Sequence, residues 1–94
     1  MKEVLLFVLE KCPYCIQAMQ WQEELMQEHP EWREIPIRIV DERKEAGLAG
    51  SYDYYYVPCY FVDGVKIHEG AAQREQVEQV LRSAFMAKES TARH

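Results

Sequence analysis

Lys11-Cys12-Pro13-Tyr14-Cys15 is the stretch that decides the fold of this 94-residue chain. It follows the apolar run Val4–Val8, which is typical of a strand buried on both faces. It opens a helical pattern that continues from Pro13 to about Glu28. Proline suits the first helical position, where its missing N–H costs little. The sequence therefore predicts a strand followed by a helix, with Cys12 at the helix N-terminus.

The N-terminus of a helix favours a negative charge, because unpaired backbone N–H groups and the positive end of the dipole lie there. We therefore expect Cys12 to react as a thiolate, with the positive charge of Lys11 beside it. Cys15 lies one turn further on the same side of the helix and is more shielded. The spacing predicts two catalytic residues, an attacking thiol at Cys12 and a resolving thiol at Cys15.

A Cys-x-x-Cys pair can also be half of a structural zinc site, which needs two further ligands. The chain offers Cys59, His29, His68 and His94, but no second close pair. A redox role fits a Cys-x-x-Cys near a βαβ pattern better, so we expect no metal site.

Composition narrows the function classes. The 11 basic and 16 acidic side chains give a net charge of −5 without a basic stripe, which argues against nucleic acid and an anionic membrane surface as partners. No stretch approaches the ~20 apolar residues of a membrane span. The N-terminal apolar run ends in the cysteine motif, not in a small-residue cleavage site. We expect a cytoplasmic protein, where cysteines serve catalysis more often than a disulfide framework.

The rest of the chain completes one domain over residues 1–94, with 88–94 as a flexible tail. The predicted elements are a strand over Ile35–Val40, a short helix from about Glu42 to Leu48, strands over Val57–Val62 and Val65–His68 around an Asp63-Gly64 turn, and a helix from about Ala72 to Ala87. The order is β-α-β-α-β-β-α. The first two strands are parallel by the crossover rule and the last two antiparallel. We expect an α/β fold with a central four-stranded mixed sheet flanked by helices.

That order, the Cys12-Pro13-Tyr14-Cys15 tetrapeptide and Val57-Pro58 at the head of the third strand resemble the thioredoxin-like fold, and glutaredoxin in particular, over residues 1 to about 87. The resemblance implies a thiol–disulfide oxidoreductase that acts on disulfide-containing proteins. It implies a cis Pro58 that faces the disulfide, and a Val57 backbone that pairs with the substrate. The residues implied to bind substrate are Lys11, Pro13, Tyr14, Val57, Pro58 and Gly70.

The resemblance also implies a monomer with no bound cofactor, which takes electrons from glutathione or a flavoprotein reductase. The glutathione site departs from the glutaredoxin pattern. Leu9 stands where glutaredoxins commonly carry Lys or Arg, Tyr56 replaces a common Thr, and Glu69-Gly70-Ala71-Ala72 replaces a Gly-Gly pair followed by a polar residue. We expect Glu69 to repel an anion, and the protein to work poorly as a glutathione-dependent mixed-disulfide reductase.

Two other classes of function compete. One is a metal or iron–sulfur module that uses Cys12 with glutathione or a partner chain, which the stiffening Pro13 disfavours. The other is a binding domain that has lost activity, which the two cysteines and Pro58 argue against.

Two features of the sequence have more than one interpretation. Tyr52, Tyr54, Tyr55 and Tyr56 could pack together or form a substrate platform. Cys59 is either a buried apolar side chain or a third redox thiol, and we expect activity not to need it.

Overall fold

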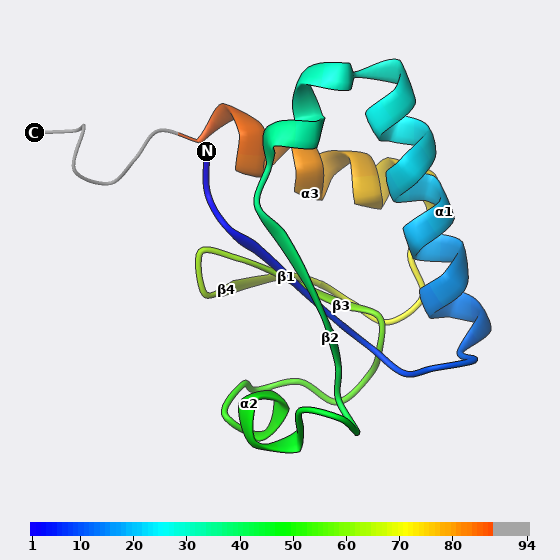
Figure 1. Cartoon of the computed structure of the whole chain (residues 1–94), viewed down its shortest axis with the longest axis vertical. Coiled ribbons are helices and arrows are strands. Elements are labelled where there is room, and N and C mark those ends of the chain that lie inside the picture. Colours follow the sequence, from blue (N-terminus) through cyan, green and yellow to red (C-terminus); the bar gives the residue numbers. More distant parts are fainter. Residues whose placement is uncertain (88–94) are drawn as a thin grey trace, which may run out of the picture.

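Strand β1 (Val4–Val8) lies inside a four-stranded sheet with the order β2-β1-β3-β4 (Figure 1). The computed structural model describes residues 1–87. β1 pairs in parallel with β2 (Ile37–Asp41) and antiparallel with β3 (Cys59–Val62), and β3 pairs antiparallel with β4 (Val65–Glu69). The sheet is mixed, as predicted, and its central strand runs directly into the cysteine motif.

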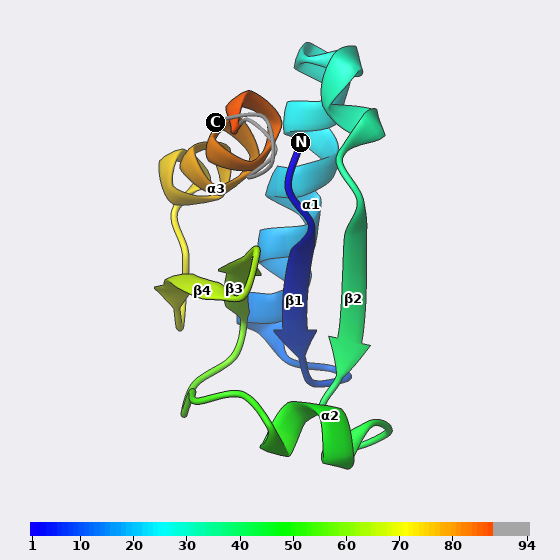
Figure 2. The ribbon, with the colours of Figure 1, turned by 90° about the vertical axis from the view of Figure 1, so that its left-hand side faces the viewer.

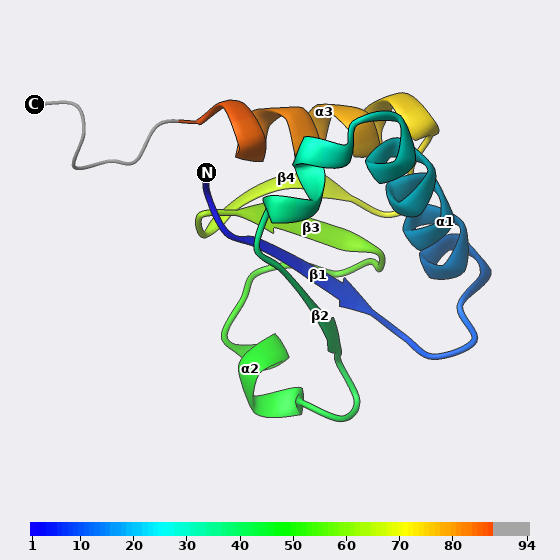
Figure 3. The same cartoon turned by 45° about the horizontal axis from the view of Figure 1, so that its top comes forward.

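The helices cover the two faces of the sheet unequally. Helices α1 (Pro13–Glu28) and α3 (Arg74–Met86) lie on one face, and the short helix α2 (Ala46–Gly50) lies on the other (Figure 3). A 3₁₀ helix, Pro30–Glu34, connects α1 to β2. The sheet therefore separates two apolar clusters of different size.

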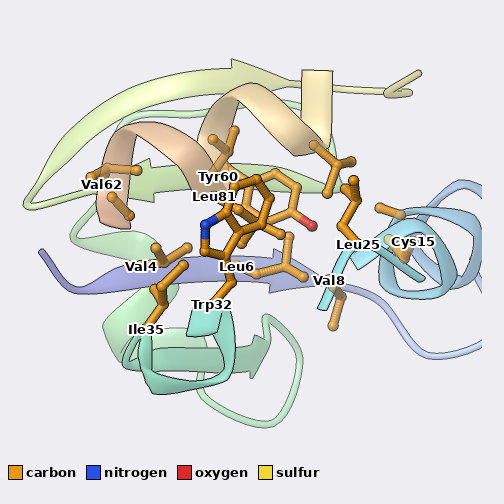
Figure 4. Packing of buried hydrophobic residues seen from close by; sticks show 14 residues of the cluster. Val4, Leu6, Val8, Cys15, Leu25, Trp32, Ile35, Tyr60, Val62 and Leu81 are labelled. Carbon is orange, nitrogen blue, oxygen red and sulfur yellow. The ribbon is translucent and has the colours of Figure 1, made fainter. Parts of the chain in front are cut away.

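The larger cluster fills the space between the sheet and the helices α1 and α3. Figure 4 shows Trp32 and Leu6 at its middle, with Tyr60 beside them and Cys15 at one margin. Trp32 is only 2% exposed within this cluster, and its ring also stacks with His29 at 4.1 Å and lies 5.2 Å from the Arg82 guanidinium. The smaller cluster, under α2, consists of Phe7, Val40, Ala49, Cys59 and Phe61.

The Asp63-Gly64 turn forms as predicted. Both residues have positive φ, 51° for Asp63 and 81° for Gly64, as a type I′ hairpin turn requires. Lys2 Nζ donates to Asp63 Oδ2 at 3.0 Å and ties the turn to the start of the chain.

Four predicted elements begin later than expected. The third strand begins at Cys59 instead of Val57, because Pro58 has no N–H to donate to the sheet. The second strand begins at Ile37, because the 3₁₀ helix extends to Glu34 and Pro36 has no N–H to donate to the sheet. The short helix begins at Ala46 instead of Glu42. Residues 42–45 form turns, in which the Asp41 carboxylate accepts the backbone N–H groups of Arg43 and Lys44.

The last helix begins at Arg74, two residues after the predicted start, where Gln73 and Gln76 form a capping box. The predicted tail, 88–94, lies outside the described residues. Within residues 1–87 no helix has the length and apolar character to span a membrane.

Candidate functional site

Cys12 occupies the N-cap position of α1, in extended backbone geometry, and Pro13 follows in the first turn. The Cys12 sulfur accepts the Cys15 backbone N–H at 3.4 Å, and the Ile16 N–H donates to the Cys12 carbonyl at 3.0 Å. A sulfur in this position faces the unpaired donors of the helix start, which stabilise a negative charge. The structure thus gives Cys12 the predicted position, in a half-buried setting.

Cys15 has a different environment from Cys12. Its side chain is buried in the larger cluster, and all three cysteines of the chain are free thiols. Burial, followed by the hydrogen bond with Cys12, raises the pKa of Cys15 to about 12. Cys15 therefore holds its proton at neutral pH, in contact distance of a thiol that is more accessible.

The turn before the motif has an unusual backbone. The Cys12 N–H donates to the Leu9 carbonyl at 3.3 Å, and Lys11 has a φ of +67°, which non-glycine residues rarely adopt. Lys11 is exposed and lines a hollow of about 210 Å³ together with Glu10, Asp41, Arg43 and Lys44.

Val57-Pro58 is a cis peptide, as predicted. Pro58 is buried, and Val57 packs against the same cluster as Cys12 and Cys15. Val57 also touches the smaller cluster, so the loop reaches both faces of the sheet. The side chains of Cys12, Cys15 and Val57 thus border one cluster, whereas the contact of Pro58 with the cysteines stays a prediction.

Gly70 lies directly beside the cis-proline loop. Its N–H donates to the Pro58 carbonyl at 2.8 Å. Its φ is +90°, a backbone conformation that residues with a side chain rarely adopt. A Cβ atom at this position would lie 3.9 Å from the Tyr56 Cβ. Glycine here lets the chain leave β4 next to Pro58.

Glu69 holds the loop that precedes Pro58, a role that the sequence reading missed. Its carboxylate accepts Lys66 Nζ at 2.7 Å and the Tyr56 backbone N–H at 2.9 Å, and it also accepts the Tyr55 N–H. Lys66 Nζ donates in addition to the Asp53 carbonyl at 3.2 Å. We call Lys66 and Glu69 the loop clamp.

The loop clamp changes the electrostatic expectation for Glu69. The Lys66 ammonium, followed by the two backbone N–H groups, lowers the pKa of Glu69 to about 2. Its charge is therefore compensated within the protein, and the expected repulsion of an anion is correspondingly smaller. Strict strand alternation would place Lys66 and Glu69 on opposite faces, but a register shift opposite Tyr60 and Phe61 brings them together.

The four tyrosines divide into two pairs. Tyr52 and Tyr54 pack on Phe7, with ring centroids 5.1 and 4.8 Å away, and Tyr54 donates to Glu42 Oε1 at 2.6 Å. Tyr55 and Tyr56 are 84% and 69% exposed. Tyr14, in the first turn of α1, is 61% exposed. Packing thus accounts for one pair, and the other pair remains available as a platform.

Cys59 is fully buried in the smaller cluster, whereas Cys15 belongs to the larger one. Burial, with a further contribution from the charge of Glu69, raises the pKa of Cys59 to about 12. This environment matches the apolar side-chain interpretation. Within residues 1–87 no group of three or more His, Cys, Asp or Glu side chains is arranged to hold a metal ion.

Several solved structures of thioredoxins are similar to this chain in fold. An oxidised thioredoxin from Plasmodium falciparum has 15% identity and a TM-score of 0.68, over 92% of this chain and 82% of that one. A mutant thioredoxin from Halobacterium salinarum has 18% identity and a TM-score of 0.66, over 94% and 78%. A thioredoxin from Fasciola hepatica has 24% identity and a TM-score of 0.62, over 86% and 79%.

At these identities the similarity concerns the fold. The chain has the thioredoxin-like fold, and the predicted fold class is confirmed. The finer likeness to glutaredoxin stays a prediction. No protein-family model matches the sequence, and no curated protein matches it.

Proposed function

We propose that this protein is a thiol–disulfide oxidoreductase that reduces protein disulfides through Cys12 and Cys15. The observation that carries the proposal is the contrast between the two thiols. The Cys12 sulfur accepts a backbone N–H at the start of α1, whereas Cys15 is buried beside it with a pKa of about 12. Cys12 is therefore suited to attack the substrate disulfide, and Cys15 is suited to react afterwards as the resolving thiol.

The reaction has two exchanges. The Cys12 thiolate attacks one sulfur of the substrate disulfide, the substrate S–S bond breaks, and a mixed disulfide forms as one substrate thiolate leaves. Cys15 then loses its proton and attacks the Cys12 sulfur, which releases the second substrate thiolate and leaves a Cys12–Cys15 disulfide. Two electrons pass to the substrate in total, and its two thiolates take up one proton released by Cys15 and one from solvent. A thiol donor, such as glutathione or a flavoprotein reductase, restores the dithiol.

Three variants test this function in an assay that follows reduction of a protein disulfide driven by dithiothreitol. Cys12→Ser is expected to remove activity above the rate with dithiothreitol alone. Cys15→Ser, mixed with the substrate without dithiothreitol, is expected to accumulate a mixed disulfide, visible as a mass increase that added dithiothreitol reverses. Cys59→Ala is the matched control, expected to keep turnover within a few-fold of wild type. Activity retained in Cys12→Ser would contradict the proposal.

We further propose that glutathione is a poor substrate partner. Leu9 supplies no charge, and Ala71 and Ala72 supply no polar side chain, at positions where glutaredoxins bind glutathione. Each lost charge-assisted hydrogen bond is worth roughly 1.5–3 kcal/mol, so losing two weakens binding by a factor of about 10² or more. The test is turnover of a small glutathione mixed disulfide in an assay coupled to glutathione reductase. Fast, saturable turnover would contradict this part of the proposal.

A further inference from the structure

The lysine and arginine side chains of residues 1–87 fall into two groups. Six form ion pairs with carboxylates: Lys2, Arg33, Arg38, Lys66, Arg74 and Arg82. The other three of this part of the chain, Lys11, Arg43 and Lys44, form no ion pair with a carboxylate within it. These three are also the cations that line the hollow of about 210 Å³. We call them the cation triad.

The hollow is positive although the chain is negative. Its two carboxylates are Glu10 and Asp41, against three cations. Asp41 is already engaged, because its Oδ1 accepts the backbone N–H groups of Arg43 at 2.9 Å and Lys44 at 3.2 Å. These hydrogen bonds, with the Arg43 N–H contributing most, hold the pKa of Asp41 below its usual range. The Lys44 charge also contributes to this lowered pKa, so Asp41 offsets part of the positive charge. The three cations still outnumber the two carboxylates that line the hollow.

The hollow adjoins the attacking thiol. Lys11 directly precedes Cys12, and Arg43 and Lys44 follow the end of β2. β1 and β2 are parallel neighbours with Val8 opposite Asp41, and Figure 2 shows both arrowheads at the same end of the sheet. The Glu42 N–H donates to the Val8 carbonyl at 3.0 Å and joins the two loops. A ligand in the hollow would lie on the β2 side of the cysteine motif.

We propose that the cation triad is a docking site for acidic residues of the polypeptide that carries the substrate disulfide. The inference rests on the proposed function and names its substrate class. All three side chains are exposed and belong to two loops, which suits several carboxylates spaced along a chain. A single small carboxylate is held more often by a buried, bidentate partner.

The test uses two synthetic peptides with one intramolecular disulfide each, identical except for Glu or Gln at positions flanking the cysteines. Wild type is expected to reduce the acidic peptide with a kcat/KM roughly 3- to 30-fold higher at low ionic strength, as one to several exposed ion pairs provide. The preference is expected to shrink as added salt shortens the screening length. The variant Lys11→Gln/Arg43→Gln/Lys44→Gln is expected to bring the ratio close to one.

The matched control is Lys2→Gln/Arg33→Gln/Arg82→Gln, which removes the same charge at paired positions and is expected to keep the preference. Equal rates for the two peptides with wild type, or equal loss of preference in both triple variants, would overturn the docking site. If the three cations increased the rate only with glutathione mixed disulfides and not with the acidic peptide, the docking site would also be overturned. The ligand of the hollow would then be the carboxylates of glutathione. Failure to reduce either peptide would instead overturn the proposed function, and the docking site with it.

Discussion

At the scale of single residues, the sulfur atoms of the three cysteines differ in access and in charge. Burial raises the pKa of both Cys15 and Cys59 from the ordinary 9.0 to about 12, which lowers the thiolate fraction at neutral pH roughly a thousandfold. Cys12 is half-buried, and its sulfur accepts a hydrogen bond from the Cys15 backbone N–H. We predict that iodoacetamide at pH 7 modifies Cys12 alone in the native, reduced protein, and all three cysteines in denaturant.

Peptide mapping by mass spectrometry after a short reaction checks this order. Because the two raised pKa values lie far above neutrality, labelling of Cys15 and Cys59 is expected to stay slow until the pH approaches the denaturing range. Native-state labelling of Cys15 ahead of Cys12 at pH 6 would reverse the assigned roles of attacking and resolving thiol.

The loop clamp leads to a prediction about Glu69. The pKa of this carboxyl is lowered to about 2 from an ordinary 4.5, so its stabilising contribution is complete above about pH 4.5 and is lost as the pH falls through about 2. Glu69→Gln removes the charge at every pH. We predict roughly tenfold faster hydrogen exchange at the Tyr55 and Tyr56 amides, and a lower kcat/KM for protein disulfides.

Nuclear magnetic resonance exchange measurements on Glu69→Gln and on a matched control provide the check. Glu78→Gln is a suitable control, because Glu78 is also paired, to Arg82 at 2.8 Å, but lies on α3. Unchanged exchange at Tyr55 and Tyr56 in Glu69→Gln would show that the loop does not depend on this carboxylate.

The roles of the residues in the candidate site differ in how well they can be predicted from the sequence. Cys12, Pro13 and Cys15 are readable because their chemistry depends on local spacing at a helix start. The roles of Glu69 and Arg43 are not, because each depends on a neighbour brought close by the sheet. The hydrogen bonds from Tyr55 and Tyr56 to Glu69 cross 13 or 14 residues and follow a register shift that no local pattern predicts.

At the scale of elements, one buried hydrogen bond joins α1 to the sheet in addition to their apolar packing. Tyr60 donates to Gln22 Oε1 at 2.9 Å, and Gln22, 8% exposed, is the buried polar side chain of residues 1–87. Tyr60→Phe leaves the Gln22 oxygen without a partner, so we predict a loss of about 1–3 kcal/mol in the free energy of unfolding. Urea denaturation measures it.

A second variant separates the hydrogen bond from packing. Gln22→Met combined with Tyr60→Phe replaces both partners by apolar groups of similar shape, and most of the lost stability is expected to return. A double variant no more stable than Tyr60→Phe would attribute the loss to packing around the Tyr60 ring.

The elements themselves were predicted unequally well. β1, α1 and the β3–β4 hairpin follow from apolar runs, a helix-starting proline and an Asp-Gly turn, which are local signals. The predicted start of α2 lies four residues before the observed one, because the polar residues 42–45 form turns and no local apolar pattern marks where the helix begins.

At the scale of the whole molecule, the two apolar clusters differ in size and in the helices that cover them. The larger cluster lies under α1 and α3, whereas α2 contributes one buried residue, Ala49, to the smaller one. Residues 42–56 are therefore held by few buried contacts. We predict that native-state hydrogen exchange is slowest in β1, β3 and α1, and that α2 with its flanking loops opens first.

Mass-spectrometric exchange on the reduced protein resolves these regions. Opening of α2 at the same free energy as β1 would mean that both faces of the sheet unfold together. The sequence alone does not give this difference, because the same alternating strand residues supply both faces and only the placement of the helices distinguishes them.

A ribosome makes β1 before either of its neighbours in the sheet. Val4 pairs with Ile37 on one side and with Val62 on the other, so the strand has no complete set of partners until the second half of the chain has emerged. Cys15 is buried only once the cluster around it has formed. The nascent chain thus carries an unshielded apolar strand next to two accessible thiols until α3, which completes that cluster, has also been made.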